Sequence, residues 1–116
     1  MISLIEATDS ERGLALMRLL EANPTLSQRQ LSKEMGLSLG KTHYLLHALL
    51  DKGLVKAGNF RRSDRKMAYA YVLTPSGLNA KLHLARAFLA KKELDYLQLQ
   101  SQITALRDEI ARNDRP

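Results

Sequence analysis

Two helix signatures separated only by a glycine turn place the tightest constraint on how this chain can fold. Ser27-Gln28-Arg29-Gln30 has the form of a capping box, because the Ser27 hydroxyl can accept from the backbone N–H three residues on while the Gln30 side chain reaches back. Gly36 then permits the positive φ that a tight turn between helices requires. This order predicts a helix-turn-helix whose first helix begins at Ser27.

The second helix of the pair is expected from Ser38, its N-cap, to Gly53, the residue after its C-terminus. Its inner stripe recurs at spacings of three and four and consists of Thr42, Leu45, Leu46 and Leu49. The opposite face has no acid before Asp51 and carries hydrogen-bond donors, a cation, an aromatic ring and an apolar group: Ser38, Leu39, Lys41, His43, Tyr44 and His47. Such side chains suit base edges and phosphates, whereas carboxylates would repel phosphate. A merely solvated face would mix both signs and be rich in Glu and Lys, so the pattern favours a DNA-reading helix.

Two strands around a basic tip are expected next. Leu54–Ala57 is a short candidate strand, and the run from Met67 to Leu73 alternates between two faces, with Tyr69 and Tyr71 on the same one. The intervening residues 58–66 contain four cations and one acid. A narrow minor groove attracts inserted Arg side chains, although a merely soluble loop is the alternative reading of this tip. The sequence therefore predicts a mainly α chain with a small β-hairpin wing, that is, a winged helix-turn-helix.

The charge of the chain is concentrated in this region. The 116 residues carry a net charge of +6, and residues 27–72 hold nine of the eighteen basic and three of the twelve acidic residues. That segment is therefore +6, and the remainder is neutral. A basic excess confined to one module is the electrostatic footprint of nucleic-acid binding.

A long helix is expected after Thr74-Pro75, with Thr at the cap and Pro at the first helical position. No proline interrupts the next stretch of about 38 residues, or roughly 57 Å of helix. A 4,3 apolar spacing, broken at Lys92, predicts a coiled-coil seam over more than four heptads. Because so long a stripe exceeds what the small domain can cover, a second copy is the expected partner, in parallel or antiparallel arrangement. The predicted dimer-interface residues are Leu78, Leu82, Ala85, Leu89, Tyr96, Leu99, Ile103, Leu106 and Ile110.

The composition argues against an enzyme. The chain has no cysteine, no Gly-rich phosphate loop and no paired carboxylates near a histidine. His43 and His47 could face one metal ion, but Asp51 alone rarely completes a site at that spacing, so no metal or other cofactor is expected. No run approaches the ~18 apolar residues that cross a bilayer, and the N-terminus lacks a secretory signal. A cytoplasmic protein without a membrane partner is therefore expected.

The chain as a whole resembles the MarR family of winged-helix regulators. The order of helix, helix-turn-helix and wing, followed by Leu73-Thr74-Pro75-Ser76-Gly77 at the start of a long helix, is that of the family. More narrowly, the chain is similar to small MarR-like regulators associated with exopolysaccharide (EPS) gene clusters. The matching segments, spread over most of residues 10–110, are Asn23-Pro24, Leu26-Ser27-Gln28-Arg29, Leu37-Ser38-Leu39-Gly40-Lys41 with Tyr44, Lys52-Gly53, Asn59-Phe60, Tyr69-Ala70-Tyr71, Leu73-Thr74-Pro75, Phe88-Leu89 and Lys91-Lys92.

The resemblance implies a homodimeric transcriptional regulator that binds double-stranded operator DNA, with EPS biosynthesis genes as targets. The residues predicted to contact DNA are Gln28, Arg29, Ser38, Leu39, Lys41, His43, Tyr44, His47, Arg61, Arg62, Arg65 and Lys66. The Asp-x-Arg wing motif of the family reads Asp64-Arg65-Lys66 here, which departs from the spacing of its Asp–Arg pair. The chain is also shorter than a typical member, and its sequence identifies no small-molecule effector.

The expected organisation is a winged helix-turn-helix DNA-binding domain at residues 1–74 and a coiled-coil dimerisation helix at residues 75–116. A different class of function is a protein-interaction adaptor, in which the coiled coil and the winged helix dock on a protein partner. The concentrated positive charge argues against the adaptor, since protein interfaces are depleted in Lys. A steep salt dependence of binding to duplex DNA separates the two.

Overall fold

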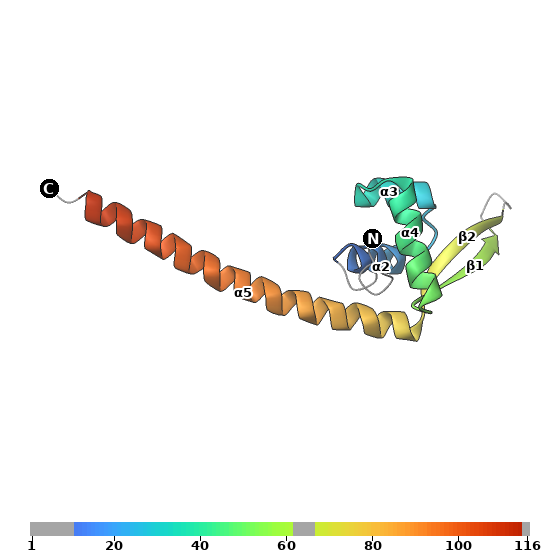
Figure 1. Cartoon of the computed structure of the whole chain (residues 1–116). Helices are drawn as coiled ribbons and strands as arrows, with labels where there is room; N and C mark the ends of the chain where they lie inside the picture. The colour runs from blue at the N-terminus through green and yellow to red at the C-terminus, as the bar shows by residue number, and fades with distance from the viewer. Residues whose placement is uncertain (1–10, 62–66, 115–116) are drawn as a thin grey trace. The chain divides into compact units, whose positions relative to one another are not determined.

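The computed structural model describes residues 11–61 and 67–114 of the chain (Figure 1). The elements follow in the order α2 (Glu11–Ala22), α3 (Gln28–Met35), α4 (Leu39–Asp51), β1 (Val55–Arg61), β2 (Met67–Leu73) and α5 (Pro75–Asn113). This arrangement confirms the predicted class, mainly α with a β-hairpin wing and a long C-terminal helix. Over the described ranges, no helix combines the length and the apolarity needed to cross a bilayer.

The chain divides into two compact units, Met1–Ala85 and Arg86–Pro116. The first turns of α5 therefore belong to the same unit as the helix-turn-helix and the hairpin. The functional division at residues 74 and 75 stays a prediction.

Short-range hydrogen bonds set the helix-turn-helix as the sequence predicts. The Ser27 hydroxyl accepts from the backbone N–H of Gln30 at 3.1 Å, and the Gln30 side chain accepts from the backbone N–H of Ser27 at 2.8 Å, which confirms the capping box. Gly36 ends α3 with a φ of 65°, a conformation that favours glycine. Ser38 caps α4 by accepting from the backbone N–H of Lys41 at 3.2 Å. The turn therefore fixes where α4 begins.

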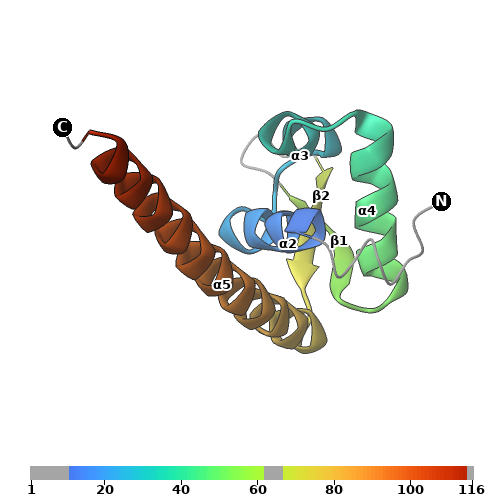
Figure 2. The same cartoon turned by 60° about the vertical axis from the view of Figure 1, so that its left-hand side comes forward.

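The hydrophobic core lies between α2, α3, α4 and the base of the hairpin. The predicted inner stripe of α4 is buried. The hydroxyl of Thr42, its one polar member, donates a hydrogen bond to the Ser38 carbonyl at 3.0 Å. Helix α2 contributes its apolar side and lies against β2 (Figure 2). The buried hydrophobic residues described are Leu14, Leu16, Met17, Leu20, Leu31, Leu45, Leu46, Ala48, Leu49, Val55, Tyr71 and Leu84.

The hairpin is longer than the sequence predicts. Strand β1 was expected to end at Ala57 but continues to Arg61, in antiparallel register from Val55 opposite Leu73 to Arg61 opposite Met67. Gly58 and Asn59 disfavour strand when taken alone, but here they pair with Ala70 and Tyr69 of β2, and the ladder supplies their backbone partners. On β2, Tyr71 is buried while Val72 is exposed, as the alternation predicts.

Hydrogen bonds and a close backbone approach connect the segment after α4 to the start of α5. The Thr74 hydroxyl donates to the Gly53 carbonyl at 2.6 Å and accepts from the backbone N–H of Gly77 at 3.0 Å. The backbone N–H of Thr74 donates to the Leu54 carbonyl at 3.1 Å. A Cβ at position 77 would lie 2.0 Å from the Leu54 carbonyl oxygen, so only glycine allows this approach without a backbone shift. Farther along α5, Lys81 forms an ion pair with Glu21 of α2 at 2.6 Å.

Candidate nucleic-acid interface

The exposed face of α4 presents the side chains that the sequence singles out for DNA. Leu39 and Tyr44 are 46% and 41% exposed, and Lys41, His43 and His47 are exposed beside them. The other face of the helix is buried in the core, which fixes the rotation of α4 about its axis. The helix therefore displays a cation, two imidazoles, a phenol and an apolar group together.

The helix-turn-helix brings α3 to the same surface. Arg29 is exposed in the first turn of α3, while the hydroxyl of Ser38 is engaged in capping α4. Gln28 is half-buried, and its amide contacts protein rather than standing free: Nε2 donates to the Tyr71 hydroxyl at 3.3 Å, and Oε1 lies 3.1 Å from Nδ1 of His43. The structure thus brings Gln28 and His43 together with Tyr71, a buried residue of β2.

The two histidines of α4 contact one another. Their ring centroids are 4.2 Å apart and the ring planes are tilted by 50°. In the described part of the chain, no group of three or more His, Cys, Asp or Glu residues could hold a metal ion. Both histidines are exposed on α4.

The remaining residues that the sequence predicts to contact DNA belong to the wing. Arg61 ends β1, where its backbone pairs with Met67. Arg62, Arg65 and Lys66, together with the Asp64-Arg65-Lys66 departure from the family motif, lie outside the described residues. Their contact with DNA stays a prediction from the sequence.

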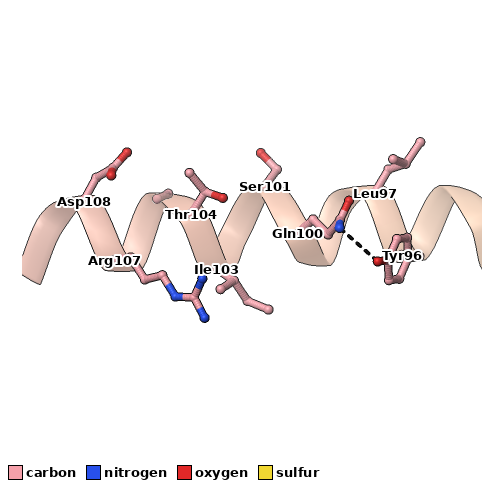
Figure 3. Close-up of a pocket in the computed structure, with 9 residues that line it drawn as sticks. Tyr96, Leu97, Gln100, Ser101, Ile103, Thr104, Arg107 and Asp108 are labelled. Carbon is pink, nitrogen blue, oxygen red and sulfur yellow. Dashed lines mark hydrogen bonds between the residues drawn. The ribbon is translucent and has the colours of Figure 1, made fainter.

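Most of the predicted seam of α5 is exposed in the single chain. Its large apolar members, from Leu78 to Ile110, are between 39% and 60% exposed, and Ala85 is half-buried. Figure 3 shows the residues that line a surface pocket on α5, all of which lie between Tyr96 and Asp108 of that helix. Leu97 points to one side of the helix and Ile103 to the other, and Gln100 Nε2 donates to the Tyr96 hydroxyl at 2.9 Å. The pocket is thus the open surface of one helix and not an enclosed ligand cavity.

Comparison with known families agrees with this geometry. Residues 9–56, which include α2, α3 and α4, match the family described as winged helix-turn-helix DNA-binding. The chain carries a winged helix-turn-helix domain. No curated protein is significantly similar to the chain.

Solved structures share the fold over nearly the whole chain. The PcaV transcriptional regulator from Streptomyces coelicolor is 19% identical, with a TM-score of 0.67 over 95% of this chain and 79% of that one. MepR, a transcription regulator of the Staphylococcus aureus multidrug efflux pump MepA, is 17% identical, with a TM-score of 0.60 over 91% and 80%. The transcriptional repressor CouR, bound to a 23-mer DNA duplex, is 19% identical, with a TM-score of 0.61 over 97% and 82%. At under 20% identity this likeness shows a shared fold, which is the fold that the MarR resemblance implies.

Tyr71, buried behind this surface, is not predicted from the sequence as part of the site. It was predicted as one member of an alternating strand, but its hydroxyl accepts from the Gln28 amide, 43 positions earlier in the chain. The sequence holds no local signal for such a contact, because it depends on how β2 packs beside the start of α3.

Proposed function

We propose that this protein is a transcriptional regulator that binds double-stranded operator DNA as a homodimer, with α4 in the major groove and the basic wing at the minor groove or the backbone. The observation that carries the proposal is the exposed face of α4, which presents Lys41, His43 and Tyr44 and no carboxylate before Asp51. A major groove admits a helix, and its base edges are read by donors, acceptors and apolar groups of this kind.

The charge distribution supports nucleic acid over a protein partner. Residues 27–72 hold the whole net charge of +6. Each phosphate neutralised by Lys or Arg releases counterions, which makes binding steeply dependent on salt. An adaptor that docks on a protein would lack this dependence.

The homodimer is proposed from the α5 seam. Apolar side chains that are half exposed in one chain recur at coiled-coil spacing, and pairing with a second copy would remove them from water. We therefore assign Leu78, Leu82, Ala85, Leu89, Tyr96, Leu99, Ile103, Leu106 and Ile110 to the dimer interface.

A salt titration of duplex binding tests the proposal. Anisotropy of a labelled duplex over a range of KCl concentrations should give a log–log slope steeper than about −4, since each phosphate contact contributes about −0.9. A slope near zero would reject DNA binding and favour the adaptor.

The operator is expected to be an inverted repeat. Two copies of α4 related by a two-fold axis must enter major grooves on one side of the duplex, so half-site centres should lie about 10 bp apart or a multiple of that. Inserting about 5 bp between the half-sites turns one of them to the far side and should reduce binding to the non-specific level. Undiminished binding after that insertion would mean that each winged helix acts alone.

For the target genes we propose EPS biosynthesis genes, on the strength of the sequence resemblance. Selection of bound genomic fragments with the purified protein tests this assignment directly. Enrichment of unrelated promoters would remove the EPS assignment and leave the DNA-binding proposal intact.

A further inference from the structure

We propose that Gln28 is a positioning residue, which holds His43 in the Nδ1–H tautomer and thereby makes His43 Nε2 a hydrogen-bond acceptor for a base edge. This inference rests on the proposed function. The sequence predicts direct DNA contacts for both residues, but the structure uses the Gln28 amide to hold the imidazole.

The hydrogen-bond partners of the Gln28 amide determine which imidazole nitrogen carries the hydrogen. In the structure Gln28 Nε2 donates to the Tyr71 hydroxyl at 3.3 Å, and Oε1 faces His43 Nδ1 at 3.1 Å. An amide oxygen can only accept. The hydrogen between the two residues must therefore be on Nδ1 of His43, and a neutral ring then carries a lone pair on Nε2.

The position of the Gln28 amide is itself anchored in the domain. Tyr71 is 9% exposed, and its backbone N–H donates to the Pro24 carbonyl at 3.0 Å, just before α3. The Gln28 carbonyl accepts from the Ser32 hydroxyl at 2.8 Å within α3. Both ends of the Tyr71–Gln28 contact thus belong to well-packed elements, which hold the amide in place beside His43 with Oε1 toward Nδ1.

The ring of His43 is restrained from a second direction. His47 lies one turn later on α4, and the two ring centroids are 4.2 Å apart. With Nδ1 bound to Gln28 and one side of the ring against His47, Nε2 is the ring nitrogen left without a protein partner among the described residues.

A lone pair at Nε2 selects among bases. In the major groove, adenine N6 and cytosine N4 are donors, whereas adenine N7, guanine N7 and O6 and thymine O4 are acceptors. His43 of the wild-type protein should therefore favour adenine or cytosine at the position it faces. The opposite tautomer, with a hydrogen on Nε2, could donate to guanine, thymine or adenine N7, so loss of cytosine is the clearest sign of the change.

The tautomer is measured first, on the DNA-free protein. Long-range ¹H–¹⁵N correlation spectra at about pH 8, above the ordinary titration range of histidine, distinguish the two neutral forms. Wild-type His43 should show the Nδ1–H pattern, Gln28→Met should show the Nε2–H form that free histidine prefers, and Gln28→Glu should restore Nδ1–H through its carboxylate. Tyr71→Phe should shift the balance partly, whereas its matched control, Tyr69→Phe at the exposed tyrosine of the same strand, should not. An Nε2–H pattern in the wild type, or no change in Gln28→Met, overturns the proposal.

Base preference is measured second, by selection from a randomised duplex. Gln28→Met and His43→Ala should lose preference at the same position of each half-site, with about fivefold weaker binding to the selected site and little change on random DNA. Retained preference in Gln28→Met would overturn the role of Gln28 in specificity. Failure of the wild type to bind any duplex would reject the proposed function instead, while the tautomer result would stand on its own. Thermal unfolding confirms that each variant is folded.

Discussion

Helices α4 and α5 carry the same kind of apolar periodicity but differ in what covers it. In α4 the stripe at Leu45, Leu46 and Leu49 is buried by the rest of its own domain. In α5 the equivalent stripe, including Leu99 and Ile103, is largely exposed. Periodicity therefore predicts which face of a helix is apolar, and the remaining chain decides whether that face is already covered. The exposed apolar face of α5 is therefore stronger evidence for a second copy than the periodicity of its sequence alone.

The largest effect is expected from charges in the α5 seam. Replacing both Leu99 and Ile103 by Glu places four carboxylates in each dimer and should weaken association by at least about 4 kcal/mol, because each would be buried without a partner. Sedimentation should show a dimer for the wild type at micromolar concentration and a monomer for the variant. The matched control replaces Leu94 and Leu97 by Glu; both are more exposed than Leu99 and Ile103 but lie off the seam, and the variant should remain dimeric. Dissociation of the control alone would place the interface on the other face.

The next effect concerns the covered face of α4. Leu46→Ala should lower the free energy of unfolding by about 2–5 kcal/mol, because the side chain is fully buried and its loss leaves a cavity. Leu39→Ala, on the exposed face of the same helix, should change stability by less than about 0.5 kcal/mol. Denaturant unfolding followed by circular dichroism compares the two. Equal losses of unfolding free energy in the two variants would contradict the division of α4 into a buried and an exposed face.

A smaller effect is expected on the exposed face of α4. Tyr44→Ala should weaken binding to the specific site by about 1–3 kcal/mol and flatten base preference. Competition between selected and random duplexes measures the difference. Equal losses on both would show that Tyr44 supplies affinity without reading sequence.

The smallest effect is expected from a phosphate contact. Arg29→Ala, in the exposed first turn of α3, should weaken all sequences alike and reduce the log–log salt slope by about 0.9. Arg112→Ala, in the last turn of α5, removes the same charge from outside the helix-turn-helix segment and should leave the slope unchanged. A change in base preference for Arg29→Ala would instead make it a base-reading residue.

The features predicted correctly from the sequence depend on residues close together in the chain. The Ser27–Gln30 capping box, the glycine turn at Gly36 and the Ser38 cap each involve partners within four positions. The inner stripe of α4 follows from helical geometry alone. The fold class could be assembled from these pieces because they occur in a recognisable order.

Features that depend on distant partners were missed. The extension of β1 to Arg61 requires pairing with β2, which outweighs the weak strand preference of Gly58 and Asn59. The contact of Gln28 with Tyr71 spans 43 positions and has no local signature. For the candidate site, the sequence could name the exposed side chains of α4 but not the hydrogen bonds that orient them.

The junction at Gly77 has a practical consequence for exchanging parts between proteins. A chimera that joins foreign DNA-binding modules to this helix at the Thr74–Pro75 bond would discard the Thr74 hydroxyl, which accepts from the Gly77 backbone N–H, and the Leu54 carbonyl that Gly77 approaches. A graft made after Ala85, where the first compact unit ends, keeps that joint whole. The transferable cassette is therefore the helix-turn-helix, the hairpin and the first turns of α5, taken together.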